Sequence, residues 1–462
     1  MSWDTTGLAV PIADSDATMG RVLIVEDGFT RGSLAACRAL ARDGWIVGIG
    51  SPEKGLAASS RWAHRWHRVP PVEEDFAGFL EETERAVRRE GYEAVFCSSD
   101  AEALGLSFGR EEITAIVPYP PHDNVVRAID KLELTEAARR VGLAAPGTVP
   151  ATAEEIRRLR GPVLVKARLH WTPGALHAPS RLKAAICHTP EEAQRLVAGW
   201  QAHGAEAVLQ EVVTGRLVHF MTIMDSDKRI LAAVQTLAEP LTNPPGVGQR
   251  VRSVTVSVDP ELERKVRELF IDLGWVGLAS LNLLLPEAGE AKLIDFNGRY
   301  SASFDQYIAA GPNFPAIWAR MVTGRSVPPR MRPKERIRFQ WLEGDLRRAL
   351  VQRRGGLVRD VVDCLSYAPG AVHTLWRWDD PVPTLRFLMR LAHDLARKLM
   401  GKLHPGPIRH GHEGAQDSGV GVSKGSRQRS EEGIGQGSDG SPGLRRSKTG
   451  RSTAAAADPS DD

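Results

Sequence analysis

Two segments near the N-terminus consist almost entirely of apolar residues and have the length of a β-strand. They read RVLIVE at residues 21–26 and WIVGIG at residues 45–50, and an amphipathic helical segment lies between them. A strand that is apolar at nearly every position is buried on both faces, which is typical of a parallel sheet covered by helices. A helix over 76–90 and a strand over 94–98 continue the alternation. The sequence therefore predicts a doubly wound parallel α/β domain over residues 21–120.

The pattern of the chain changes after residue 120 to long strands with few helices between them. A helix is predicted over 124–141, and another begins behind Asp259 and Pro260, which suit an N-cap and a first helical turn. The longest predicted strands cover residues 162–167, 206–213, 217–224, 229–237, 277–285 and 291–296. We expect a mixed antiparallel sheet with helices, an α+β fold, over residues 121–330.

The two ends of the chain are expected to lie outside the folded domains. Residues 1–20 lack the basic start and the apolar core of a secretory signal, and we expect a disordered leader there. Residues 331–404 are expected to form a C-terminal helical extension. Residues 405–462 have almost nothing to bury, so we expect a disordered tail.

The composition and the short motifs of the chain argue against several classes of protein. The 60 basic and 57 acidic residues give a net charge of +3, which does not favour a nucleic-acid partner. The segment SRWAHRWHR at 60–68 interleaves aromatic and basic residues, but we predict a surface loop there. The sequence GLSFG at 105–109 matches a nucleophile elbow, but a predicted helix leads into it instead of the required strand. The absence of a membrane-length apolar run and of metal-binding cysteine spacing is typical of a cytoplasmic protein.

The strongest sign of chemistry is the sequence LIDFNGR at residues 293–299. Alternate residues of a strand project from one face, so Asp295, Asn297 and Arg299 are predicted to point the same way. A carboxylate and an amide oxygen suit Mg²⁺, and a guanidinium suits the phosphate that this ion accompanies. Asn282, on the expected hairpin partner, offers another oxygen. The alternative is a structural Asp–Arg pair at a polar strand end.

Two lysines and a polar pair lie beside predicted strands and helices. Lys166 follows the apolar run PVLV, where a buried lysine requires an anion unless its amine reaches solvent. Lys131 lies near the start of a helical segment, for which a solvated face is the alternative. Gln210 and Glu211 end an apolar segment that suits either backbone contact with an adenine or a plain core strand.

Taken in order, these segments resemble the ATP-grasp superfamily, and in particular its carboxylate–amine ligase branch, which includes D-alanine–D-alanine ligase, carbamoyl phosphate synthetase and biotin carboxylase. The matching segments are D-K to P at 130–146, VLVK at 163–166, QEVVTG at 210–215, PPGVG at 244–248, GLASLN at 277–282, DFNGR at 295–299 and AGPNFP at 310–315. The resemblance covers about residues 21–325. It implies a pre-ATP-grasp α/β domain followed by a two-lobed ATP-grasp domain.

The resemblance also implies a site for ATP. Lys131 and Lys166 match the two lysines that hold the phosphates, one from each lobe. Gln210 and Glu211, with the backbone of Val213, match the segment beside the adenine.

A magnesium site is implied in the same way. Asp295 and Asn297 match the metal ligands, with Asp in place of the usual Glu, and Asn282 stands where a metal-binding carboxylate is usual. Arg299 matches the arginine that faces the transferred phosphate or the substrate carboxylate, and Arg250 and Arg252 lie where the family often places a phosphate-binding arginine.

The implied activity is an ATP-dependent ligation of a small-molecule carboxylate to an amine. ATP would phosphorylate the carboxylate, and the amine would attack the acyl phosphate, so that ADP and phosphate are released. Asn282 lacks a charge, and Leu217 stands where many members carry a ribose-binding carboxylate. The alternative is therefore a nucleotide-binding ATP-grasp protein with weak or no ligase activity.

The segment 382–404 predicts a basic amphipathic helix. An apolar stripe that includes Leu385, Leu388 and Met389 runs along one side, and basic residues lie largely off that stripe. Such a helix docks on the protein's own body or on a twin subunit in a homodimer, or it lies on an anionic membrane as a peripheral contact.

Overall fold

A computed structural model describes residues 19–169, 171, 182–243 and 249–403, all within one compact unit, Met1–Val422. Of the predicted leader, only residues 19 and 20 are described, and Gly20 already begins a strand. The predicted tail and the second unit, Ser423–Asp462, lie outside the described residues. Among the described helices, none combines the length and the apolar composition needed to cross a membrane.

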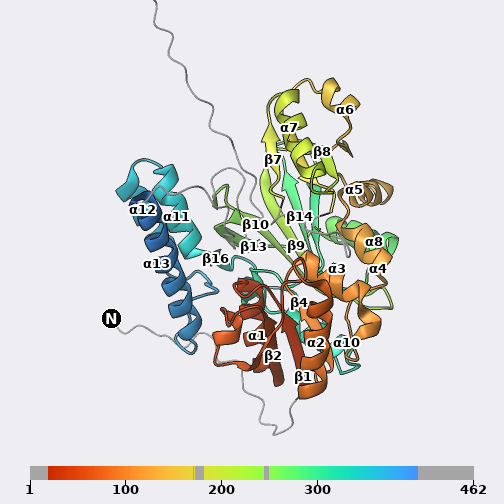
Figure 1. The fold of residues 1–462 in the computed structure, drawn as a ribbon, viewed down its shortest axis with the longest axis vertical. Coiled ribbons are helices and arrows are strands. Elements are labelled where there is room, and N and C mark those ends of the chain that lie inside the picture. Colours follow the sequence, from red (N-terminus) through yellow and green to blue (C-terminus); the bar gives the residue numbers. More distant parts are fainter. Residues whose placement is uncertain (1–18, 170, 172–181, 244–248, 404–462) are drawn as a thin grey trace, which may run out of the picture. The chain divides into compact units, whose positions relative to one another are not determined.

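The N-terminal part contains a four-stranded parallel sheet with strand order β3-β2-β1-β4 (Figure 1). The strands are β1 (Gly20–Val25), β2 (Trp45–Ser51), β3 (Ala63–Arg68) and β4 (Ala94–Cys97), with helices α1 (Arg31–Arg42), α2 (Phe76–Glu90) and α3 (Asp100–Phe108). The predicted parallel sheet is confirmed, and its central residues are fully buried. Because β4 returns to lie beside β1, the carboxyl ends of these two strands flank the point where strand order reverses, the usual ligand position in such sheets.

The surface loop predicted at 60–68 is wrong, because β3 is an edge strand of this sheet and pairs with β2. Its polar side chains, such as Arg65 and Arg68, are exposed, and charged residues are the usual protection of a sheet edge. The helix predicted to lead into GLSFG is confirmed. Ser107 lies within α3 and donates to the Leu104 carbonyl (3.0 Å), so the segment is not a nucleophile elbow.

Two antiparallel sheets follow, with strand orders β15-β14-β9-β10-β13-β16 and β5-β8-β6-β7. The first consists of β9 (Arg216–Met224), β10 (Ile230–Ala238), β13 (Arg252–Val256), β14 (Gly277–Leu285), β15 (Lys292–Asn297) and β16 (Arg338–Gln340). The second consists of β5 (Thr148–Pro150), β6 (Val163–Ala167), β7 (Ala185–Cys187) and β8 (Ala207–Glu211), and a separate short pair is β11 (Thr242–Asn243) with β12 (Gln249–Arg250). The predicted combination of a parallel α/β part with an antiparallel α+β part is confirmed.

The helix predicted over 124–141 is two helices, α4 (His122–Ile129) and α5 (Lys131–Arg140). Asp130 separates them, because its backbone is extended and its carboxylate accepts hydrogen bonds from the Leu132 and Glu133 amides (2.8 and 3.3 Å). This N-cap places Lys131 at the first position of α5. The other helices up to residue 322 are α6 (Ala153–Arg158), α7 (Pro190–Gln201), α8 (Pro260–Leu273), α9 (Phe304–Ala310) and α10 (Phe314–Val322).

An aromatic cluster joins the parallel sheet to the segment after β15. The ring of Phe96 on β4 lies 5.6 Å from that of Tyr300 and 4.9 Å from that of Trp318, and all three residues are fully buried. These contacts fix the backbone next to Arg299 against the carboxyl end of β4.

The C-terminal part contains α11 (Leu342–Gln352), α12 (Leu357–Tyr367) and α13 (Val382–Leu403). Asp380, before α13, is buried and accepts hydrogen bonds from Arg38 Nε (2.9 Å), Ser60 Oγ (2.5 Å) and the Arg61 amide (3.0 Å). A fully buried ion pair therefore ties this part to α1.

Asp380→Ala is expected to destabilise the chain by about 3–5 kcal/mol, because it leaves the buried Arg38 without its carboxylate. Urea denaturation followed by tryptophan fluorescence measures the loss. Asp379→Ala is the matched control, since Asp379 forms an exposed pair with Arg42, and such pairs contribute about 0–1 kcal/mol. Equal losses in the two variants would contradict the structural role of Asp380.

Candidate functional site

The candidate site lies on one face of the hairpin formed by β14 and β15. Asn282 pairs with Asp295 and Ser280 pairs with Asn297 in the antiparallel register. Residues that pair directly project from the same face, so the register places Asn282, Asp295 and Asn297 together, as the sequence predicted.

Hydrogen bonds connect Asp295 and Asn297 on β15 with Arg299, which follows the strand. Arg299 Nη2 donates to Asn297 Oδ1 (2.8 Å), and Asn297 Nδ2 lies 3.4 Å from Asp295 Oδ2. Arg299 Nε also donates to Asp100 Oδ1 (2.9 Å) at the start of α3. The candidate site is therefore continuous with the carboxyl edge of the parallel sheet.

Lys131 reaches this face from the start of α5. Its amine forms an ion pair with Asp295, and the residue is almost completely buried. Burial alone would lower the pKa of Lys131, but the attraction of Asp295 raises it above the ordinary value. The start of α5 is also held by Arg168, whose Nε donates to Asp130 Oδ2 (2.7 Å). Lys131 is therefore a fixed cation beside Asp295.

Lys166 reaches the same strand from β6 in the four-stranded sheet. Its Nζ donates to the Ile294 carbonyl (3.3 Å), and it forms no ion pair with any carboxylate in the described part of the chain. Burial lowers the pKa of Lys166 to about 8, although the charge of Asp295 acts in the opposite direction. Two lysines from separate elements thus reach the strand that carries Asp295, and Lys166 has no carboxylate of its own among the described residues, so an additional anion would stabilise its charge.

Arg250 is a buried guanidinium next to this face. Its partners among the described residues are hydroxyl groups, Thr236 Oγ1 (2.9 Å), Ser303 Oγ (2.8 Å) and Tyr307 OH (3.2 Å). Hydroxyl groups satisfy hydrogen bonds but do not compensate the charge, so the arrangement suits an incoming anion.

His219 is a site residue that the sequence did not reveal. In the register of the six-stranded sheet it pairs with Asn282 on one side and with Thr236 on the other. Asp295, Asn282, His219 and Thr236 thus form a row across four strands, which we call the polar row. His219 Nε2 is buried without a hydrogen-bond partner among the described residues. Burial and the charge of Arg250 lower the pKa of His219 well below its ordinary value, so the imidazole is neutral.

The other residues that the sequence predicted for the site, Arg252, Gln210 and Glu211, bond to groups outside the polar row. Arg252 is engaged by Asp345 Oδ2 (2.5 Å) and Asp363 Oδ2 (2.7 Å), which tie β13 to α11 and α12, so the structure does not bring it to the polar row. Gln210 is buried at the end of β8 and donates to Thr148 Oγ1 (3.0 Å). Glu211 forms an ion pair with Lys292 on β15 (2.8 Å).

Val213 lies in the partly buried turn between β8 and β9. It follows Glu211, which bonds to β15, so this turn starts beside the same strand that carries Asp295.

The oxygen donors of the candidate site fit one Mg²⁺ ion. They are the carboxylate of Asp295 and the amides of Asn282 and Asn297, and the Asn282 amide forms no hydrogen bond with the described residues. Nowhere in the described ranges do three His, Cys, Asp or Glu side chains gather around a metal position. Mg²⁺ commonly binds one or two carboxylates together with phosphates and water, which agrees with this donor set.

Buried carboxylates lie at the carboxyl edge of the parallel sheet, next to Asp100. Glu102 Oε2 accepts hydrogen bonds from the Ser98 and Ser99 amides (2.9 Å each), and Glu26 follows β1. Burial raises the pKa of Glu102 to about 8 and that of Glu26 well above its ordinary value. This acidic edge flanks the reversal of strand order.

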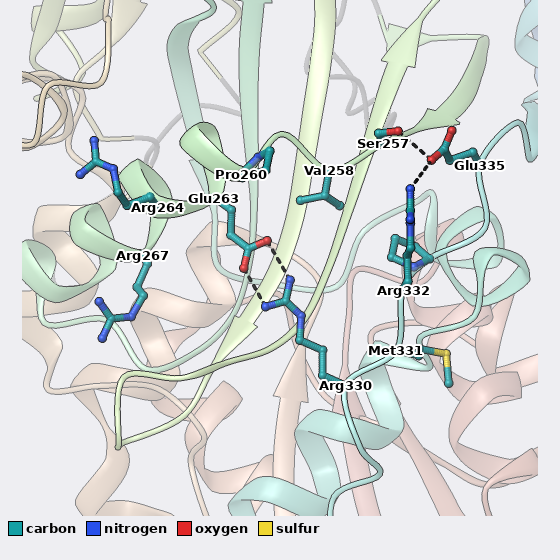
Figure 2. A pocket seen from close by; sticks show the side chains of 11 residues that line it. Ser257, Val258, Pro260, Glu263, Arg264, Arg267, Arg330, Met331, Arg332 and Glu335 are labelled. Carbon is teal, nitrogen blue, oxygen red and sulfur yellow. Dashed lines mark hydrogen bonds and ion pairs between the residues drawn. The ribbon is translucent and has the colours of Figure 1, made fainter.

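A separate hollow of about 750 Å³ lies between the start of α8 and the segment 330–335 (Figure 2). Glu263 forms an ion pair with Arg330 (2.7 Å), and Glu335 accepts from Ser257 Oγ (2.7 Å) and lies 3.4 Å from Arg332. The polar row contributes nothing to this hollow, and the charges of two of its arginines are compensated, so it is not the candidate site.

No family model and no curated protein matches the chain. Solved structures do match its fold. An N5-carboxyaminoimidazole synthetase from Staphylococcus aureus aligns with a TM-score of 0.55 at 13% identity, covering 73% of this chain and 86% of that one. An L-amino acid ligase from Bacillus licheniformis aligns with a TM-score of 0.51 at 14% identity, covering 66% and 75%.

The biotin carboxylase domain of a 2-oxoglutarate carboxylase from Hydrogenobacter thermophilus, solved with MgADP, aligns with a TM-score of 0.52 at 15% identity. The alignment covers 68% of this chain and 73% of that one. At these identities the likeness establishes a shared fold.

Proposed function

Because the chain has the ATP-grasp fold, we propose that it is an ATP-dependent ligase that joins a carboxylate to an amine. In this proposal residues 21–120 form the pre-ATP-grasp domain, residues 121–330 form the ATP-grasp domain, and residues 331–404 form the helical extension. The observation that carries the proposal is the convergence of Lys131 and Lys166 on the strand that bears Asp295.

The two lysines would hold the phosphates of ATP. Lys131 comes from α5 and Lys166 from the four-stranded sheet, so a nucleotide between them would be held from two sides. Gln210, Glu211 and the backbone of Val213 would lie beside the adenine, since β8 pairs with the strand that carries Lys166.

Mg²⁺ would be held by Asp295 and Asn297, with Asn282 as an uncharged third donor. When bound, the ion supplies positive charge that compensates the phosphates during transfer. Arg299 and Arg250 supply fixed positive charge nearby, and Arg299 is oriented by Asp100. Arg252 has a structural role in this proposal, because two carboxylates engage it.

The reaction would proceed in two steps. A carboxylate oxygen attacks the γ-phosphorus of ATP, which breaks the bond to the bridging oxygen and yields an acyl phosphate and ADP. The amine then attacks the acyl carbon, phosphate leaves, and the amine loses a proton. Glu102, which lies with Glu26 at the acidic edge, would accept this proton, because a pKa of about 8 suits a general base near neutral pH.

Release of ADP from ATP tests the proposal. With Mg²⁺ present, turnover is expected to depend on the joint addition of a carboxylate and an amine, screened as pairs of amino acids, and a condensed product is expected by mass spectrometry. ATP turnover that no carboxylate stimulates would contradict a ligase.

A second candidate function is nucleotide binding with weak or no ligation. The uncharged Asn282 favours it, since the polar row then contains a single carboxylate for the metal. Saturable ATP binding without ADP release across the screen would support this alternative over the ligase.

His219→Leu is expected to lower phosphate release from ATP by about 10–100-fold, because in this proposal the Nε2 of His219, unpartnered among the described residues, would form a hydrogen bond with the transferred phosphate in a buried setting. Binding of MgADP is expected to change by less than about twofold, since His219 lies beyond Asn282 from the Lys131–Asp295 pair. The matched control is His393→Leu at an exposed position of α13. If His219→Leu lost MgADP binding and phosphate release to the same extent, a contact between His219 and the transferred phosphate would be refuted.

A further inference from the structure

The exposed apolar side chains of the chain are concentrated in its C-terminal part. Of seventeen large apolar residues that are exposed in the described ranges, thirteen lie between residues 350 and 391. Scattered exposed apolar residues are ordinary, whereas a concentration of this kind marks an interaction surface.

The helix α13 shows two different sides. Phe387 packs against the main core, and the guanidinium of Arg390 lies 3.7 Å from the ring centre of Phe29 and 3.2 Å from Glu53. By contrast, two residues of the apolar stripe are largely exposed, Leu385 at 58% and Met389 at 64%. The helix therefore rests on the N-terminal part with one side and leaves its apolar stripe uncovered.

A second apolar ridge lies on α12, which packs against α11 (Figure 1). Val358, Val362 and Leu365 recur at helical spacing and are 78%, 58% and 52% exposed. Arg347 of α11 lies over the ring of Phe387, so α11 also contacts α13. We call the exposed apolar residues of α11, α12 and α13 the C-terminal apolar surface.

Among the described side chains around the C-terminal apolar surface, the exposed charges that form no ion pair are positive. Six arginines of α11 to α13 and their connections are exposed and form no ion pair with a described carboxylate, namely Arg347, Arg353, Arg354, Arg359, Arg386 and Arg397. The exposed carboxylates of the same segment, among side chains that are described, are Asp363 and Asp379, which pair with Arg252 and Arg42.

We propose that the C-terminal apolar surface binds an anionic membrane, with the apolar ridges in the interface and the arginines on the lipid headgroups. Apolar ridges flanked by cations, with exposed Trp376 and Trp378 between α12 and α13, are typical of a helix that lies on a bilayer. A second copy of the chain fits less well, because a two-fold interface would bring the same arginines together without compensating carboxylates. This surface is separate from the proposed catalysis.

Sedimentation of the full chain with lipid vesicles tests the proposal. The protein is expected to sediment with vesicles of phosphatidylcholine and phosphatidylglycerol, to bind phosphatidylcholine alone at least about tenfold more weakly, and to be released by salt. The variant L385Q/M389Q and the variant R359E/R386E are each expected to lower the partition coefficient at least tenfold, with circular dichroism unchanged.

Two control variants lie outside the surface. Met331→Gln changes an exposed methionine and Arg332→Glu an exposed arginine, and both are expected to bind vesicles like the natural chain. Failure of the natural chain to bind anionic vesicles overturns the proposal, as does equal loss in the control variants. A natural chain that is dimeric in solution, with a monomeric L385Q/M389Q variant that still binds vesicles, would instead assign the surface to self-association.

Discussion

Asp295→Asn is expected to lower ATP turnover by about 10²–10³-fold while the chain remains folded. Asp295 is the single carboxylate of the polar row, and Lys131 is paired with it. The amide keeps the shape of the side chain but removes the charge that Mg²⁺ requires. Turnover is measured as ADP release with Mg-ATP, and circular dichroism confirms folding.

Two further variants make the Asp295 result specific. Asp295→Glu is expected to retain measurable turnover, because a carboxylate remains at the end of β15. Asp272→Asn, which changes an aspartate paired with Arg140 on α5, is expected to leave turnover unchanged. Turnover like that of the natural chain in folded Asp295→Asn would remove Asp295 from the metal site.

Lys166→Met is expected to weaken ATP binding by about 100-fold, because it removes a charge-assisted hydrogen bond to phosphate in a desolvated position. Methionine has a similar length and no charge, so packing beside β15 is retained. Binding is measured by titration calorimetry with Mg²⁺ present. Lys183→Met, a lysine between β6 and β7, is the control and is expected to bind ATP normally.

The lowered pKa of Lys166 adds a pH dependence to this prediction. Below pH about 8 its amine is already charged and ready for phosphate. Above that pH the protein must take up a proton to bind ATP, so the Kd is expected to rise by up to about tenfold per pH unit. Lys166→Arg stays charged and is expected to flatten this rise. A Kd of the natural chain that does not change between pH 7 and 9 would contradict a phosphate contact by Lys166.

Local periodicity was enough to predict much of the fold and part of the site. The apolar runs that became β1 and β2 required a parallel sheet, and the spacing of Asp295, Asn297 and Arg299 placed these residues on one face. The split of the helix at Asp130 has a signal in the sequence, an aspartate followed three residues later by Glu133, which is a common helix start.

Contacts between distant segments could not be predicted, because they depend on strand register and on the path of the chain. Lys131 and Asp295 are 164 residues apart, and His219 joins the polar row through the pairing of β9 with β14. Arg250 and Arg252 have the same spacing as two residues on one strand face. The strand is interrupted at Val251 between β12 and β13, however, so the two arginines enter different networks.

The central claim is that a magnesium-bound nucleotide lies between α5, β6 and the β14–β15 hairpin. Titration calorimetry of the folded full chain with ATP tests it most directly. We predict saturable binding at a single site that requires Mg²⁺ and is weakened in Lys166→Met. Absence of any heat of binding for ATP or ADP, with Mg²⁺ present and the chain folded, would contradict the account.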